Sequence, residues 1–162
     1  MTSLADRALA ALVSLLLLAS PVLADDARDW HIQKLIACHD TPQALPLLLS
    51  LADAGAIDPA APAFSQDGEN CWRVEGGLDI AGIPFAAVCV ATADPFLIRQ
   101  FPDFFYRTYG TAPPEIFALI SDQAPDELAA PIAATRGFYV DPERIEPDYA
   151  EIGRSRVACA RF

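Results

Sequence analysis

The sequence predicts an α+β domain, in which a small, mostly antiparallel sheet of about four to five strands carries helices on one face. Three observations predict this fold class: apolar segments that begin at prolines and have helical spacing, two alternating segments joined by a glycine turn, and an alternating C-terminal segment. Four cysteines, Cys38, Cys71, Cys89 and Cys159, are typical of a small exported fold held by two disulfides.

Residues 29–40 (DWHIQKLIACHD) fit two kinds of secondary structure. Apolar and polar residues nearly alternate along them, which is typical of a strand, whereas Ile32, Leu35 and Ile36 also share one face of a helix. Because a capped helix follows directly, we prefer a strand that leads into that helix.

The helix that follows should begin at Thr41-Pro42, which supplies an N-cap residue and then a proline for the first turn. It carries a stripe of leucines and should end at Gly55, because glycine is common just beyond helix C-termini. Pro46 lies just past the first turn and should bend the helix or delay its start. Residues 58–70 contain two prolines and a glycine and are expected to form a loop.

Residues 71–90 (CWRVEGGLDIAGIPFAAVCV) predict a β-hairpin. The turn should lie at Ile80-Ala81-Gly82, because glycine adopts positive φ angles freely. Pro84 fits only at the start of a strand or on an edge, since it has no backbone N–H to donate.

Three short helices are expected next. Asp94-Pro95 is an N-cap followed by a proline, and residues 115–121 and 124–134 are expected to be helical, with Asp126 as a candidate cap of the latter. Towards the C-terminus, residues 137–140 and 154–162 are expected to form strands on either side of a loop at 141–150.

Side-chain faces favour the disulfide pairs Cys38–Cys71 and Cys89–Cys159. In a regular hairpin Cys71 shares its face with charged residues and Cys89 shares its face with apolar ones, so a bond between them would set unlike rows against each other. Gly76-Gly77 leaves an alternative open: a bulge there would invert the parity and make Cys71–Cys89 the pair.

The N-terminus predicts export. Arg7 is followed by an apolar run that is shorter than a membrane span, and Val22-Leu23-Ala24 offers a signal-peptidase site. We expect residues 1–24 to be a signal peptide and residues 25–162 to be one periplasmic or secreted domain, without membrane insertion after cleavage.

Composition excludes several classes of activity. A net charge of −11 disfavours nucleic acid as a partner. The two histidines, His31 and His39, lie too far apart on a regular helix or strand to share a metal. The sequence contains no GxSxG, P-loop, GxGxxG or HExxH motif, so we expect no cofactor or metal.

These observations favour a non-catalytic binding or interaction role in the cell envelope, with an envelope protein or a small ligand as partner. The candidate binding patch is Arg99, Tyr106 and Arg107, beside an aromatic stripe, Phe101, Phe105 and Tyr109, that fits the core better. The alternatives are a small envelope hydrolase that uses an unidentified carboxylate pair and a purely structural envelope component.

Overall fold

The computed structural model describes residues 30–34, 36, 44–105, 115–135, 140 and 144–161. The chain divides into two compact units, Met1–His31 and Ile32–Phe162, and all of the described residues except 30 and 31 belong to the second. The predicted signal peptide, Thr41-Pro42 and residues 137–139 of the strand predicted at 137–140 lie outside the described residues, and Val140 is not in a strand. Within the described ranges, no helix combines the length and apolar character that crossing a bilayer requires.

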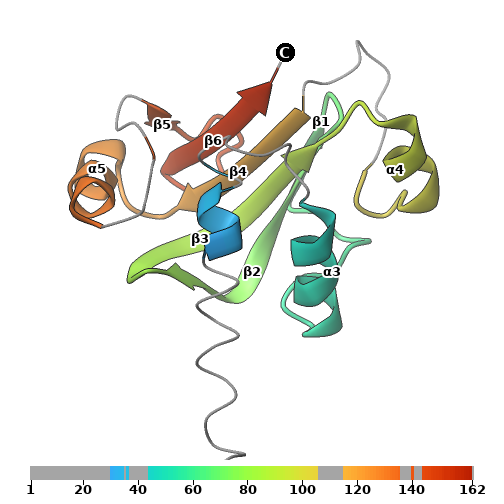
Figure 1. The fold of residues 1–162 in the computed structure, drawn as a ribbon, viewed down its shortest axis with the longest axis horizontal. Coiled ribbons are helices and arrows are strands. Elements are labelled where there is room, and N and C mark those ends of the chain that lie inside the picture. The colour runs from blue at the N-terminus through green and yellow to red at the C-terminus, as the bar shows by residue number, and fades with distance from the viewer. Residues whose placement is uncertain are drawn as a thin grey trace, which may run out of the picture. The chain divides into compact units, whose positions relative to one another are not determined.

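Six antiparallel strands form one curled sheet in the order β1-β2-β3-β4-β6-β5 (Figure 1). Their bounds are Phe64–Gln66 for β1, Glu69–Ile80 for β2, Ile83–Ala91 for β3, Glu115–Ser121 for β4, Ile145–Pro147 for β5 and Ser155–Arg161 for β6. The α+β class and the antiparallel sheet are confirmed, but the expected number of strands was too low. The two edge strands, β1 and β5, fall in segments predicted as loops, because three residues are too few to show alternation.

The described helices are residues 30–34 with 36, α3 (Leu45–Asp53), α4 (Pro95–Gln100) and α5 (Pro125–Ala134). The preference for a strand within residues 29–40 was wrong for the residues that the structure describes: residues 30–34 and 36 are helical, and Ile32 and Ile36 are buried one helical turn apart. The predicted helix end at Gly55 is confirmed, because α3 ends at Asp53 and Gly55 has a φ of 69°. The predicted start at Thr41-Pro42 was wrong: α3 starts at Leu45 with Ala44 as its N-cap, so of the two effects expected of Pro46 the delayed start is the one observed.

The caps of α4 and α5 are local. Asp94 caps α4 as predicted, because its carboxylate accepts the N–H of Phe96 at 2.8 Å. At α5, Glu127 accepts the N–H of Ala124 at 2.8 Å, so the carboxylate that closes this helix start is Glu127 and not the expected Asp126.

Residues 115–121 were predicted to be helical and instead form β4, an interior strand of the sheet. Both faces of β4 are covered, so its apolar residues run continuously instead of alternating. Phe117 and Leu119 face one core, and Ala118 and Ile120 face the other. A short apolar run of this kind has no period that separates a strand from a helix.

The sheet has a different core on each face. The larger core joins Trp72, Val88, Val90 and Phe117 to buried residues of α3 and α5, so the prediction of helices on one face is confirmed. The second face has mostly small side chains and is closed by a loop; its buried members are Cys71, Ala87, Cys89, Ala118, Ile120 and Ile152.

A bulge divides the β2–β3 hairpin into two registers. Next to the predicted turn, Ile80 lies opposite Ile83 and Leu78 opposite Phe85, whereas further along Arg73 lies opposite Ala87. Four residues of β2 therefore face one residue of β3, and Gly76 and Gly77 within the bulge have φ angles of 79° and 73°.

This bulge overturns the preferred disulfide pairs. The three additional residues of β2 shift the pairing with β3 by an odd number, so Cys71 lies directly opposite Cys89 and bonds to it. Along β2 the even-numbered residues face the larger core on both sides of the bulge, whereas along β3 the core-facing residues change from Ile83 and Phe85 to Val88 and Val90. The predicted pairs Cys38–Cys71 and Cys89–Cys159 are therefore wrong, and the alternative that a bulge left open is the one observed. Cys159 is not a free thiol, while Cys38 lies outside the described residues.

Candidate functional site

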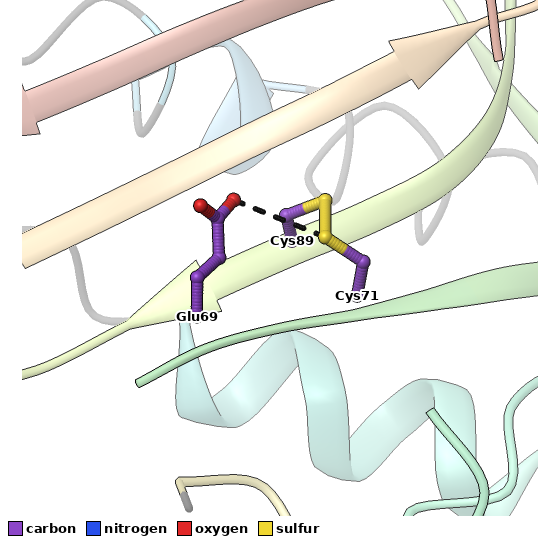
Figure 2. A group of neighbouring side chains, drawn as sticks. All are labelled: Glu69, Cys71 and Cys89. Carbon is purple, nitrogen blue, oxygen red and sulfur yellow. Dashed lines mark hydrogen bonds between the residues drawn. A yellow bond between two sulfur atoms is a disulfide. The ribbon is translucent and has the colours of Figure 1, made fainter. Parts of the chain in front are cut away.

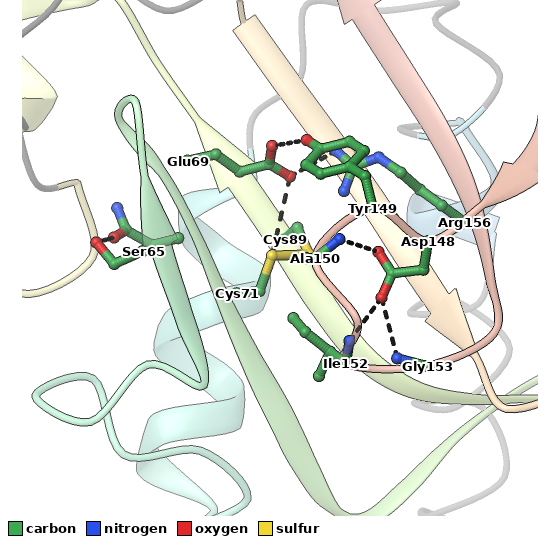
Figure 3. Close-up of a disulfide and its surroundings, with 11 residues drawn as sticks. Ser65, Glu69, Cys71, Cys89, Asp148, Tyr149, Ala150, Ile152, Gly153 and Arg156 are labelled. Carbon is green, nitrogen blue, oxygen red and sulfur yellow. Dashed lines mark hydrogen bonds and ion pairs between the residues drawn. A yellow bond between two sulfur atoms is a disulfide. The ribbon is translucent and has the colours of Figure 1, made fainter.

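The loop from Asp148 to Gly153, here called the strap, closes the second face of the sheet (Figure 3). The Asp148 carboxylate accepts the backbone N–H groups of Ala150, Ile152 and Gly153 at 3.2, 2.8 and 3.0 Å. Gly153 lies so close to β4 that a Cβ there would be 2.5 Å from Ile120 Cγ2. Internal hydrogen bonds and close packing thus fix the strap against the sheet.

A buried ion pair lies beneath the strap. Arg156 Nη2 donates to Glu69 Oε1 at 2.5 Å, although the two residues are only 3% and 5% exposed. The Tyr149 hydroxyl donates to the other Glu69 oxygen, and the Tyr149 ring lies 4.7 Å from the Arg156 guanidinium carbon (Figure 3). Arg156 Nη1 is buried without a hydrogen-bond acceptor, so the aromatic ring is its main compensation.

Glu69, Cys71 and Cys89 place one carboxylate oxygen and two sulfurs within 4.8 Å of one another (Figure 2). The sulfurs are joined in a disulfide, so neither is a thiolate that could bind a metal. For the same reason the 3.8 Å approach of Cys71 Sγ to Glu69 is a contact without a donated hydrogen. The Glu69 charge is balanced by Arg156 and the two sulfurs are bonded to each other, so the cluster joins β2 to β3 and β6; together with Arg156 and Tyr149 we call it the latch.

Tyr149 provides a test of the latch. Partial burial and the hydrogen bond to Glu69 raise the pKa of Tyr149 well above its ordinary value of about 10, although the nearby Arg156 charge opposes the rise. The folded state therefore favours the neutral phenol, and its contribution to stability is intact below about pH 10 and lost as the pH rises further.

We expect Tyr149→Phe to remove one tyrosine ionisation that lies above the ordinary tyrosine range. Spectrophotometric titration of the folded protein should then show one ionisation fewer than the four tyrosines of the wild type, and the missing step should lie above pH 10. Loss of a step near the ordinary tyrosine pKa would contradict the hydrogen bond to Glu69.

A separate cavity of about 340 Å³ lies between the start of α3, α4 and the adjoining ends of β3 and β4; we call it the α3–α4 pocket. Its volume falls in the range of small-molecule sites. Apolar side chains form most of its described wall: Leu45, Val90, Ala91, Leu97, Phe105 and Ile116. The pocket therefore offers an apolar ligand group a surface that excludes water.

Two carboxylates belong to the wall of the same pocket. Asp94 is exposed and Glu115 is half-buried, and neither forms an ion pair with any residue in the part of the chain that the structure describes. Thr92, also in the wall, accepts the N–H of Asp94 at 3.1 Å and fixes that residue's backbone. Both charged side chains in the described wall of this pocket are thus acidic.

The predicted binding patch is described only in part. Arg99 is exposed in the last turn of α4, while Tyr106 and Arg107 lie outside the described residues. Of the aromatic stripe, Phe105 is buried in the larger core as expected, Phe101 packs partly against it, and Tyr109 is not described.

The pocket residues escaped the sequence analysis. Asp94 was recognised only as a helix cap, and Glu115 only as part of a supposed helix. The pocket joins segments near residues 45, 90 and 115, so no local sequence pattern marks it. Correct assignment of residues 115–121 as a strand would have placed Glu115 beside the end of β3 and so indicated the pocket.

Comparison of the chain with protein-family models, with curated proteins and with solved structures gives no match.

Proposed function

We propose that this protein is an exported, non-catalytic binding domain whose ligand enters the α3–α4 pocket. The ligand has an apolar body, which packs against Val90 and Phe105, and a cationic group, which approaches Asp94 and Glu115. The observation that carries the proposal is the combination of an apolar cavity of about 340 Å³ with two carboxylates that have no described cationic partner. The signal-peptide pattern of residues 1–24 supports the cellular location.

The two parts of the pocket would contribute differently. Burial of an apolar group the size of a leucine side chain contributes roughly 1.5–3 kcal/mol before the costs of association. The carboxylates would contribute selectivity, because they attract a cation and repel an anion of the same shape, and the net charge of −11 strengthens this preference at a distance.

The proposal is tested with three probes of one shape and different charge: hexylamine, hexanol and hexanoate. We expect hexylamine to bind best, hexanol more weakly and hexanoate least, with amide NMR shifts concentrated at Val90, Ala91 and Ile116. Glu115→Gln and Asp94→Asn should each weaken hexylamine binding about threefold to tenfold and leave hexanol binding unchanged.

The variants are chosen to preserve the fold. Asparagine caps helices about as well as aspartate, so Asp94→Asn keeps the start of α4. Glu75→Gln removes an exposed carboxylate outside the pocket and serves as the matched control. Equal affinity for hexylamine and hexanoate, or shifts that avoid the pocket, would rule the proposal out.

A further inference from the structure

A second cavity, of about 330 Å³, lies at the other end of β3 and β4, beside the hairpin bulge. It shares no described wall residue with the α3–α4 pocket. The bulge and the loop after β4 both contribute to its wall, so Gly77 and Gln123, which are distant in sequence, line the same space. We call this cavity the bulge pocket, and its chemistry is different.

Arg73 gives the bulge pocket a positioned cationic group. One of its guanidinium nitrogens, Nη2, donates to the Ile152 carbonyl of the strap, which holds the side chain in place. The other, Nη1, lies 3.9 Å from Asp122 Oδ1, beyond hydrogen-bond distance. Since a guanidinium has five N–H donors, most of them remain available to a ligand.

Asp122 supplies the acceptor of the pocket. It is an exposed carboxylate, with 66% of its side chain accessible. Pro84, which is exposed, and Ala86, which is half-buried, give the same cavity an apolar wall.

We propose that the bulge pocket binds a free α-amino acid with an apolar side chain. The carboxylate lies on the Arg73 guanidinium, as planar guanidinium groups favour. The ammonium group donates to Asp122, and the side chain packs against Pro84 and Ala86. Only a molecule with adjacent negative and positive groups matches Arg73 and Asp122 at their short separation.

The test titrates the purified protein with L-leucine by calorimetry and by amide NMR. We expect saturable binding with shifts at Gly77 and Gln123, at least tenfold weaker binding of N-acetyl-L-leucine and L-leucinamide, and weaker binding of glycine. Each of these compounds lacks one of the three groups that the pocket recognises.

Variants separate this site from a general charge effect. Arg73→Gln and Asp122→Asn should each weaken leucine binding at least tenfold. Arg154→Gln is the matched control, because Arg154 is similarly exposed and faces a carboxylate, Glu127, at 3.3 Å outside the pocket.

If Arg73→Gln disturbs the strap, Asp122→Asn decides the result, since that side chain is exposed. Failure of leucine to bind at millimolar concentration, or equal binding by the acetylated and amidated compounds, would overturn the assignment. Binding of hexylamine in the α3–α4 pocket would be unaffected, so the two proposals stand or fall separately.

Discussion

Glu69→Met is expected to lower the free energy of unfolding by about 3–5 kcal/mol, the largest effect of any single change discussed. The substitution nearly preserves side-chain length but leaves the Arg156 guanidinium buried, charged and without its carboxylate. Tyr149 also loses the acceptor for its hydroxyl. Urea unfolding of the wild type and the variant, followed by fluorescence, measures the difference.

Two further variants show whether the loss of stability comes from the buried Arg156 charge that no longer has a carboxylate partner. Glu69→Met combined with Arg156→Met removes both charges and should recover most of the loss, because a buried ion pair can often be exchanged for apolar packing. Arg154→Met breaks an exposed pair whose side chains are 61% and 57% accessible, so it should cost at most about 1 kcal/mol. A double variant no more stable than Glu69→Met alone would contradict the explanation.

Removal of the Cys71–Cys89 disulfide is expected to cost about 3 kcal/mol. The bond joins residues 18 apart. The figure is the free energy that corresponds to the conformational entropy lost by the unfolded chain when a loop of this size is closed. The double variant Cys71→Ala with Cys89→Ala should therefore unfold at a lower urea concentration, with the sheet otherwise intact, because alanines also occupy neighbouring positions of this face.

Peptide mapping without reduction tests the pairing itself. It should yield a peptide in which Cys71 is linked to Cys89. A Cys38–Cys71 link would restore the pairing that a regular hairpin implies, and an unchanged urea midpoint in the double alanine variant would show that the bond contributes little to stability.

Features with local causes were predictable from the sequence. Asp94-Pro95 marks the start of α4 because both the cap and the proline act within one turn. The Ala81-Gly82 turn was likewise correct, since the two residues have φ angles of 54° and 82°, as a tight hairpin turn requires.

Features that depend on distant neighbours were not predictable. β4 becomes a strand because β3 and β6 pair with both of its edges, and those partners are remote in sequence. Glu69 and Arg156 are 87 residues apart, and the sequence around each residue contains no pattern that predicts their ion pair. Both pockets join separate segments in the same way, so the candidate sites became visible only once the sheet order was known.

Because of the hairpin bulge, the number of residues between Arg73 and Leu78 determines which residues of β2 and β3 lie opposite each other. The turn fixes the register at one end and the disulfide fixes it at the other, so the residues between them act as a spacer of set size. Deleting one of these residues would turn Cys71 towards the opposite face of the sheet, away from Cys89. A substitution within the spacer keeps the number of residues unchanged. After a single insertion or deletion, the register that the turn requires and the register that the disulfide requires are no longer compatible.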